Sequence, residues 1–214
     1  LSLQGVFDSM LGACALNSKS DCIAEPADAL WQGGGAVATI LIELAGFAAD
    51  NIFGIYDPLN PRAQQVTLFD GAAGAGSSTT LAFVANGSGY DVQTGGVTMG
   101  HFASADFGFF LHTPQHNTFF SQTSLNDDRA DHLYAYRGNG DPFVSGPLSG
   151  TAFATSMYLL AFEDLKIPKG DSDYQDFVAA INFMTPIPLP AGIWLLGAAL
   201  VALMPWRRGN RVIR

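Results

Sequence analysis

Cysteine and basic residues are scarce in this sequence of 214 residues. Cys14 and Cys22 are the only cysteines, and no second cysteine cluster or histidine-rich segment lies near them, so a zinc site is their least expected use. Lysine and arginine together number 10, against 19 acidic residues. Because phosphate binding requires a basic surface, this composition argues against a nucleic-acid partner.

Sequence motifs of common hydrolases are also missing. No G-x-S-x-G elbow is present, and Pro114 opposes a helix that would bring His112 and His116 together as metal ligands. Glu163 and Asp164 are adjacent, and neighbouring residues of a strand point to opposite faces, so we do not expect them to flank one glycosidic bond. These observations favour a protein that is not an enzyme.

Charge is absent from one long stretch near the end of the chain, residues 191–206. With the apolar residues from Ile187 onward it gives about 20 residues, which at ~1.5 Å per residue are just enough to span a thin bilayer. Arginines follow at 207, 208, 211 and 214, so the positive-inside rule places this end in the cytoplasm and the preceding chain outside. A buried core helix is the alternative, but the run lacks the polar face of such a helix.

This tail, residues 186–214, resembles the PEP-CTERM sorting signal, in which a proline-containing motif precedes an apolar helix and a basic end. The residues that carry the resemblance are Pro188, Leu189, Pro190 and Ala191, followed by Arg207 and Arg208. The resemblance implies an exported protein of a Gram-negative bacterium, held transiently in the inner membrane by its C-terminal helix. An exosortase-type enzyme would then cut the tail and release the protein to the cell surface, the outer membrane or the extracellular matrix.

Export has a consequence for the cysteines. In an oxidising compartment Cys14 and Cys22 would close a short loop as a disulfide, and two reduced buried thiols are the alternative. The chain starts at Leu1 without a basic segment followed by an apolar one, so we expect that a signal peptide has been removed or that the start is a fragment.

Residues 1–185 have the length and the pattern of one exported β domain. They contain six basic and 19 acidic residues, a net charge of −13 that suits solubility and cation binding. Short segments rich in Phe, Val, Thr and Tyr alternate with Gly, Asn, Asp and Pro, which predicts a mainly β fold, a β-sandwich or jelly-roll-like domain. The expected strands are 36–44, 51–56, 65–69, 80–85, 107–112, 118–122, 132–136, 155–163 and 177–182. One short helix or turn is expected at 7–16 and another at 27–31.

The strongest chemical signal in this domain is a cluster of acidic residues, five within 14 positions: Glu163, Asp164, Asp171, Asp173 and Asp176. Clustered carboxylates repel one another unless a cation or water screens them. Calcium, which takes ~6–8 oxygen ligands in irregular geometry, is the natural candidate, although the spacing is not that of an EF-hand. A solvated acidic turn is the alternative. In a second acidic patch we assign Asp127 and Asp128 to a turn and keep Asn126 and Asp131 as further candidate ligands.

Three stretches between 107 and 181 resemble a family of uncharacterised domains found in PEP-CTERM proteins and in large secreted adhesins. The stretches are FGFFL from Phe107, TFFS from Thr118 with SLN and DH after it, and YLLAFEDL from Tyr158 continuing to GDSDYQDFV from Gly170. Lys169 and Gln175 replace the glycine and asparagine usual in that family. The resemblance implies an exported β-sandwich module with calcium at the acidic loop, and it supplies no reaction.

Three hypotheses for the function follow. The first is a structural or adhesion-type module of the cell surface or of an exopolysaccharide-containing matrix such as a biofilm, sorted by its tail and stabilised by calcium. The second is a module that binds carbohydrate or another surface through exposed aromatic side chains, Tyr134, Tyr136 and Tyr174. The third is a subunit of an extracellular filament or coat that retains its apolar tail.

Overall fold

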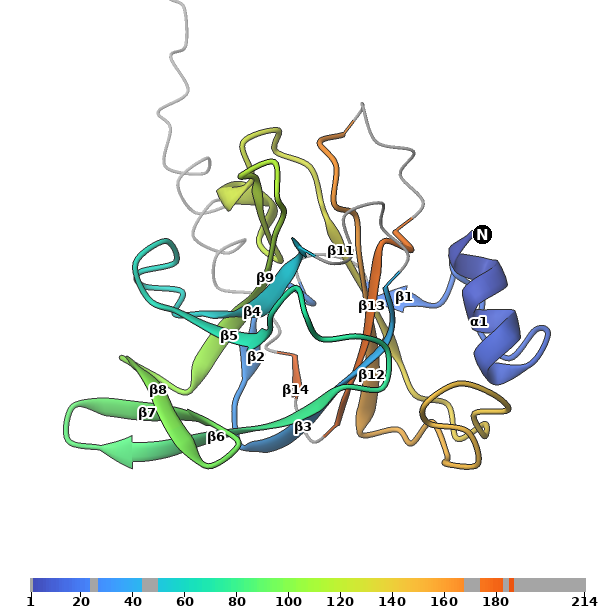
Figure 1. The fold of residues 1–214 in the computed structure, drawn as a ribbon, viewed down its shortest axis with the longest axis horizontal. Helices are drawn as coiled ribbons and strands as arrows, with labels where there is room; N and C mark the ends of the chain where they lie inside the picture. Colours follow the sequence, from blue (N-terminus) through green and yellow to red (C-terminus); the bar gives the residue numbers. More distant parts are fainter. Residues whose placement is uncertain (1, 24–26, 44–49, 168–173, 183–184, 187–214) are drawn as a thin grey trace, which may run out of the picture.

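The computed structural model describes residues 2–23, 27–43, 50–167, 174–182 and 185–186. These residues form a mainly β fold with one short α-helix, which confirms the expectation that the domain is mainly β (Figure 1). The elements in chain order are α1 (Leu3–Leu11), β1 (Cys22–Ile23), β2 (Trp31–Gln32), β3 (Gly35–Glu43), β4 (Ile52–Tyr56), β5 (Gln65–Phe69), β6 (Ser78–Asn86), β7 (Gly89–Thr94), β8 (Val97–Phe102), β9 (Asp106–His112), β10 (Thr118–Phe120), the 3-10 turn η2 (Thr123–Leu125), β11 (Leu133–Arg137), β12 (Met157–Phe162), β13 (Phe177–Asn182) and β14 (Thr185–Pro186).

The strands form two antiparallel sheets. The larger sheet has the order β1-β11-β12-β13-β3-β6-β7-β8, and the smaller one has the order β14-β2-β9-β4-β5, with β10 paired to β9. The hairpins of β6, β7 and β8 extend at one side of the molecule, and α1 lies at the opposite side beside β1 (Figure 1). Strands that are distant in sequence are therefore neighbours in the sheets, as β13 and β3 or β2 and β9 are.

The main core lies between the two sheets and is largely aromatic. Phe53 of β4 stacks on Phe177 of β13, with ring centroids 4.7 Å apart, and meets the edge of Phe162 of β12 at 5.8 Å. All three side chains are buried. Aromatic pairs in such arrangements contribute ~0.5–1.5 kcal/mol beyond the burial of their surface. These contacts fix the end of β4 against the ends of β12 and β13.

A second core lies on the other face of the larger sheet, where α1 covers β12 and β13. Phe7 of α1 meets Tyr136 edge to face, with centroids 4.8 Å apart, and α1 residues cluster with Leu159 and Val178. Because both faces of β12 and β13 are covered, these strands are apolar at nearly every position rather than at alternate ones.

The helix begins and ends earlier than the expected 7–16. The Ser2 hydroxyl accepts a hydrogen bond from the N–H of Gly5 at 3.2 Å and caps the first turn. Gly12, with φ +89°, ends the helix. The segment 27–31 forms a turn that leads into β2 rather than a helix.

Most expected strands are present, and β5 and β13 have the expected bounds. The prediction missed the hairpin of β7 and β8, which Gly95 and Gly96 connect as a two-residue turn with positive φ angles. Two glycines between strands are a hairpin signal. The strands themselves lack an alternating apolar pattern, because β7 buries only Gly89 and Val92 and β8 buries only Phe102.

The predicted tail falls almost entirely outside the described residues, since 187–214 are not described. Pro186, its first residue, pairs with Trp31 where β14 meets β2. Among the described residues, no helix has the length and apolar character needed to cross a membrane.

Candidate metal centre

The acidic cluster forms where two paired strands end. In the antiparallel pair β12–β13, Phe162 lies opposite Phe177, so the next residues outward are Glu163 and Asp176. The backbone N–H of Asp164 donates a hydrogen bond to Oδ2 of Asp176 at 3.1 Å, which closes the strand ends across the pair. The sheet register therefore brings together carboxylates that are 12 or 13 residues apart in the sequence.

Glu163, Asp164 and Asp176 each place one carboxylate oxygen within 4.8 Å of the others. The expectation that Glu163 and Asp164 diverge was wrong, because β12 ends at Phe162 and strand alternation does not govern the residues that follow. Glu163 is 0% exposed and Asp164 is 3% exposed, whereas Asp176 is partly buried. Two of the three converging carboxylates are therefore shielded from water.

Converging buried carboxylates fit a hard cation. Like charges at this separation repel strongly where water is excluded, and an ion between them replaces repulsion with attraction. Oxygen ligands in an irregular arrangement suit calcium better than zinc or copper, which prefer nitrogen and sulfur. Asp171 and Asp173, which the sequence also predicts as ligands, lie outside the described residues.

Asn126 of the second acidic patch braces a turn. Its Oδ1 accepts a hydrogen bond from the N–H of Phe120 at 2.7 Å, and its Nδ2 donates to the carbonyls of Phe120 and Ala130 at 3.0 and 2.9 Å. Oδ1 of Asp131 accepts from the N–H of Leu133 at 3.1 Å. Within the described part of the chain, Asp131 does not belong to the group of converging carboxylates.

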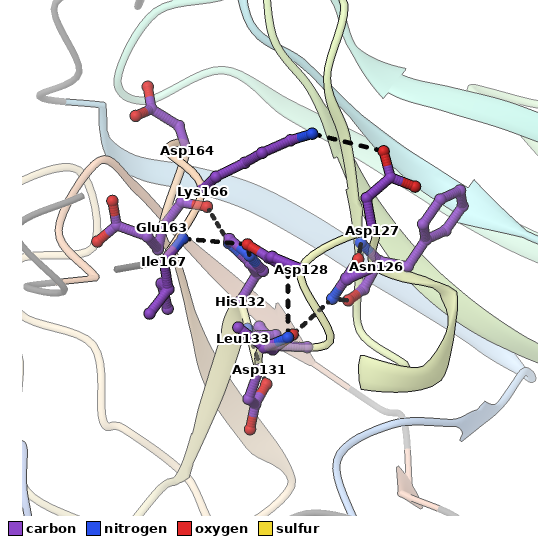
Figure 2. Close-up of polar contacts among 12 residues, drawn as sticks. Asn126, Asp127, Asp128, Asp131, His132, Leu133, Glu163, Asp164, Lys166 and Ile167 are labelled. Carbon is purple, nitrogen blue, oxygen red and sulfur yellow. Dashed lines mark hydrogen bonds and ion pairs between the residues drawn. The ribbon is translucent and has the colours of Figure 1, made fainter. Parts of the chain in front are cut away.

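A buried histidine, which carried no expectation from the sequence, connects this second patch to the acidic cluster. Figure 2 shows His132 between Asp128 and the backbone of Glu163: Nδ1 lies 3.0 Å from the carbonyl oxygen of Glu163, and Nε2 lies 2.9 Å from Oδ2 of Asp128. The ring of His132 also stacks on Phe119, with centroids 4.0 Å apart. These contacts hold the backbone that carries the Glu163 carboxylate.

Asp128 is a hydrogen-bond hub rather than an ion ligand. Besides His132, it accepts from the N–H groups of Ala130 and Ile167 at 3.1 and 3.0 Å. Burial opposes ionisation of Asp128, but the hydrogen bonds from His132 and the two backbone groups outweigh it and lower the pKa of Asp128. The neighbouring Asp127 is exposed and forms surface ion pairs with Lys166 and Arg62, as the expected turn position implies (Figure 2).

The aromatic platform expected from the sequence is present only in part. Tyr134 and Tyr174 stack with centroids 4.0 Å apart and line a groove of about 670 Å³ together with polar residues such as Gln4 and Lys19. Burial, a hydrogen bond with Tyr134 and nearby carboxylates raise the pKa of Tyr174. The expected exposure was wrong for two of the three tyrosines. Tyr174 is 7% exposed, and Tyr136 is buried under α1, where its hydroxyl donates to the carbonyl of Ser18 at 2.7 Å.

Among the described residues, neither the cysteines nor the histidine pair belongs to the group of converging carboxylates. Cys14 is an exposed free thiol and Cys22 a partly buried one in β1, so the disulfide of an oxidising compartment stays a prediction. His112 ends β9, and His116 lies in the turn before β10 with φ +61°. The two histidines therefore do not lie on successive turns of one helix, in agreement with the expectation from Pro114.

The acidic cluster lies in a part of the chain that matches a known protein family. The family model is described as a domain of unknown function, DUF4114, and it matches residues 74–184. This range includes Glu163, Asp164 and Asp176, and it also includes the stretches that resemble uncharacterised domains. No match was found among curated proteins or among solved structures.

Proposed function

Because the chain belongs to the DUF4114 family, whose function is unknown, we propose its role from the site itself: a calcium-stabilised structural module exported to the cell surface or the extracellular matrix. In this proposal the two sheets form a β-sandwich of the jelly-roll kind. Calcium holds the open strand ends of the sandwich together. The C-terminal signal directs the module out of the cell through an exosortase-type enzyme.

The observation that carries the proposal is the convergence of Glu163, Asp164 and Asp176 within 4.8 Å, with the first two buried and the third partly buried. In this proposal the ligand is a cation, because burial of two of the three carboxylates disfavours their unscreened charges. A cation that binds only the folded state stabilises it by mass action, by ~2.7 kcal/mol when the free ion is at 100 times its Kd. A protein outside the cell meets calcium at high concentration, so weak extracellular sites of ~10⁻⁴–10⁻³ M are useful there.

Export is supported by the sequence features of the tail and by the strongly acidic body. Residues 1–185 carry a net charge of −13, which keeps a secreted module soluble and favours cations around it. The sorting signal implied by residues 188–191 and the arginines after them accounts for an apolar run at the end of an otherwise water-exposed domain.

Thermal unfolding with calcium and with excess chelator tests the metal proposal. We expect chelation to lower Tm, and we expect Asp176→Asn to remove most of this response because it deletes one charge of the site. Asp127→Asn is the matched control, since it removes an exposed carboxylate from the same region and should keep the full response. A wild-type Tm that is unchanged by chelator, with no metal in elemental analysis, would overturn the proposal.

A second candidate function, binding of carbohydrate, is favoured by the groove that Tyr134 and Tyr174 line beside polar side chains. Aromatic faces with polar neighbours are typical of sugar sites. Binding to a glycan array that disappears in Tyr174→Ala but persists in Tyr90→Ala, a change in the distant β7, would support this candidate.

A further inference from the structure

A polar residue of the smaller sheet lies against the acidic cluster. Asn51 immediately precedes β4 and is 2% exposed, and its Nδ2 lies 3.5 Å from Oδ2 of Asp164. The two residues are 113 positions apart. The contact therefore joins the smaller sheet, through β4, to the larger sheet, through the end of β12.

The packing of Phe53 explains how Asn51 comes to this place. Asn51 lies two residues before Phe53 in the chain, just before the start of β4. Phe53 packs on Phe162 and Phe177, which are the last residue of β12 and the first of β13. Just beyond these aromatic contacts, Asn51 precedes β4 of the smaller sheet. Glu163 and Asp176 occupy the corresponding positions at the ends of β12 and β13 of the larger sheet.

The side-chain amide of Asn51 can accept a further bond through its oxygen at this position. Its Oδ1 is buried and has no hydrogen-bond partner among the described residues, although a buried amide oxygen without a partner is costly, ~1–3 kcal/mol. Rotation of about 180° around the Cβ–Cγ bond exchanges Oδ1 with Nδ2, because the two atoms occupy equivalent positions on a planar group. The oxygen then faces the carboxylates in place of the donor.

We propose that the side-chain oxygen of Asn51 is a further ligand of the cation held by Glu163, Asp164 and Asp176, so that the ion fastens the two sheets to each other. This inference rests on the proposed function. A neutral amide oxygen is a common calcium ligand, and it raises the ligand number without adding to the negative charge of the site. In the ion-free protein the NH2 group of Asn51 faces Asp164 and offsets part of its charge; on binding, the amide turns.

Terbium luminescence measures this directly, because terbium seeks the same oxygen ligands as calcium and its decay rates in H2O and D2O count the water molecules bound to the ion. We expect Asn51→Leu, which has a similar size but no oxygen, to bind one more water than the wild type. We also expect it to bind calcium about tenfold more weakly, the factor that corresponds to 1.4 kcal/mol. Asp127→Asn should match the wild type in both measurements.

Asn51→Asp keeps the test decisive where Asn51→Leu does not fold. As a ligand, the new carboxylate leaves the water count unchanged, holds calcium at least as tightly as Asn51 does, and makes the ion-free protein less stable through repulsion from Asp164. A tenfold weaker affinity or an extra bound water in Asn51→Asp would overturn the inference.

The outcomes separate this inference from the proposed function. An unchanged water count and affinity in Asn51→Leu, while Asp176→Asn loses binding, would leave the metal centre standing and reduce Asn51 to a hydrogen-bond donor. Failure of the wild type to bind either terbium or calcium would overturn both.

Discussion

At the scale of single residues, the candidate centre depends on side chains that the sequence alone marks unequally. Glu163, Asp164 and Asp176 are visible as an acidic cluster, and their convergence follows once β12 and β13 are paired. Asn51 lies 113 residues from Asp164 and carries no local motif, so only the packing of Phe53 brings it to the site. His132 starts an expected strand, so the sequence gives no sign of its role. Its hydrogen bonds to Asp128 and Glu163 form only when the chain folds.

Acid stability should depend on Asp128. Its pKa is lowered in the folded protein, so its stabilising contribution is complete above the unfolded value of ~3.9 and is lost as the pH falls through the folded value. We expect Asp128→Asn to lower the free energy of unfolding by ~1–3 kcal/mol at pH 7, because it weakens hydrogen bonds to buried donors.

The difference between wild type and Asp128→Asn should shrink as the pH falls from about 3.9, where the carboxylate of the unfolded chain becomes protonated, through the lower pKa of Asp128 in the folded protein. Denaturant unfolding of both proteins from pH 7 to pH 2.5 measures this difference, and carboxylates common to both cancel from it. A difference that stays constant over the whole range would show that the charge of Asp128 does not stabilise the fold.

At the scale of secondary structure elements, the sequence predicts strands that have a strong local pattern and misses strands that depend on contacts with distant residues. The bounds of β5 and β13 follow from short apolar runs closed by turn residues. The hairpin of β7 and β8 has partly exposed strands with no alternation, and β1, β2 and β14 are too short to leave a pattern. Apolar residues at successive positions of β12 identify a strand but not which face each side chain covers.

A glycine in β9 offers a test of how the smaller sheet is packed. Gly108 lies opposite Tyr56, and a Cβ on Gly108 would be 2.2 Å from the ring of Tyr56. That ring has little freedom to move, because its hydroxyl donates to Oε1 of Gln122 at 3.0 Å. We expect Gly108→Ala to destabilise the protein by ~1–3 kcal/mol, measured by denaturant unfolding.

Gly34→Ala is the control for this substitution, since no atom lies within 4 Å of the Cβ that it adds. Equal stability of the two variants would contradict the described packing of Tyr56 over β9.

At the scale of the whole molecule, the sheets share an aromatic core at their centre and, in our proposal, an ion at one end. The contacts of Phe53 hold the sheets together close to the acidic residues, so the ion would act on an interface that is already positioned. In our proposal the module works outside the cell, where calcium is abundant enough to fill weak sites.

Protein isolated from its own cells shows whether the C-terminal tail is removed by processing. If an exosortase-type enzyme processes the chain, mass spectrometry of the mature protein should find a C-terminus near Pro190 and no peptide from residues 191–214. Recovery of the complete tail on secreted material would contradict processing and would favour a filament or coat subunit that retains it.

In our proposal Glu163, Asp164 and Asp176, whose carboxylates converge where the strands end, hold calcium. The decisive experiment is a crystal structure of the protein grown with calcium, with anomalous data collected at a long wavelength. We expect an anomalous peak ~2.3–2.6 Å from oxygens of these three residues. Well-ordered carboxylates with no peak between them, at calcium concentrations that saturate weak extracellular sites, would contradict it.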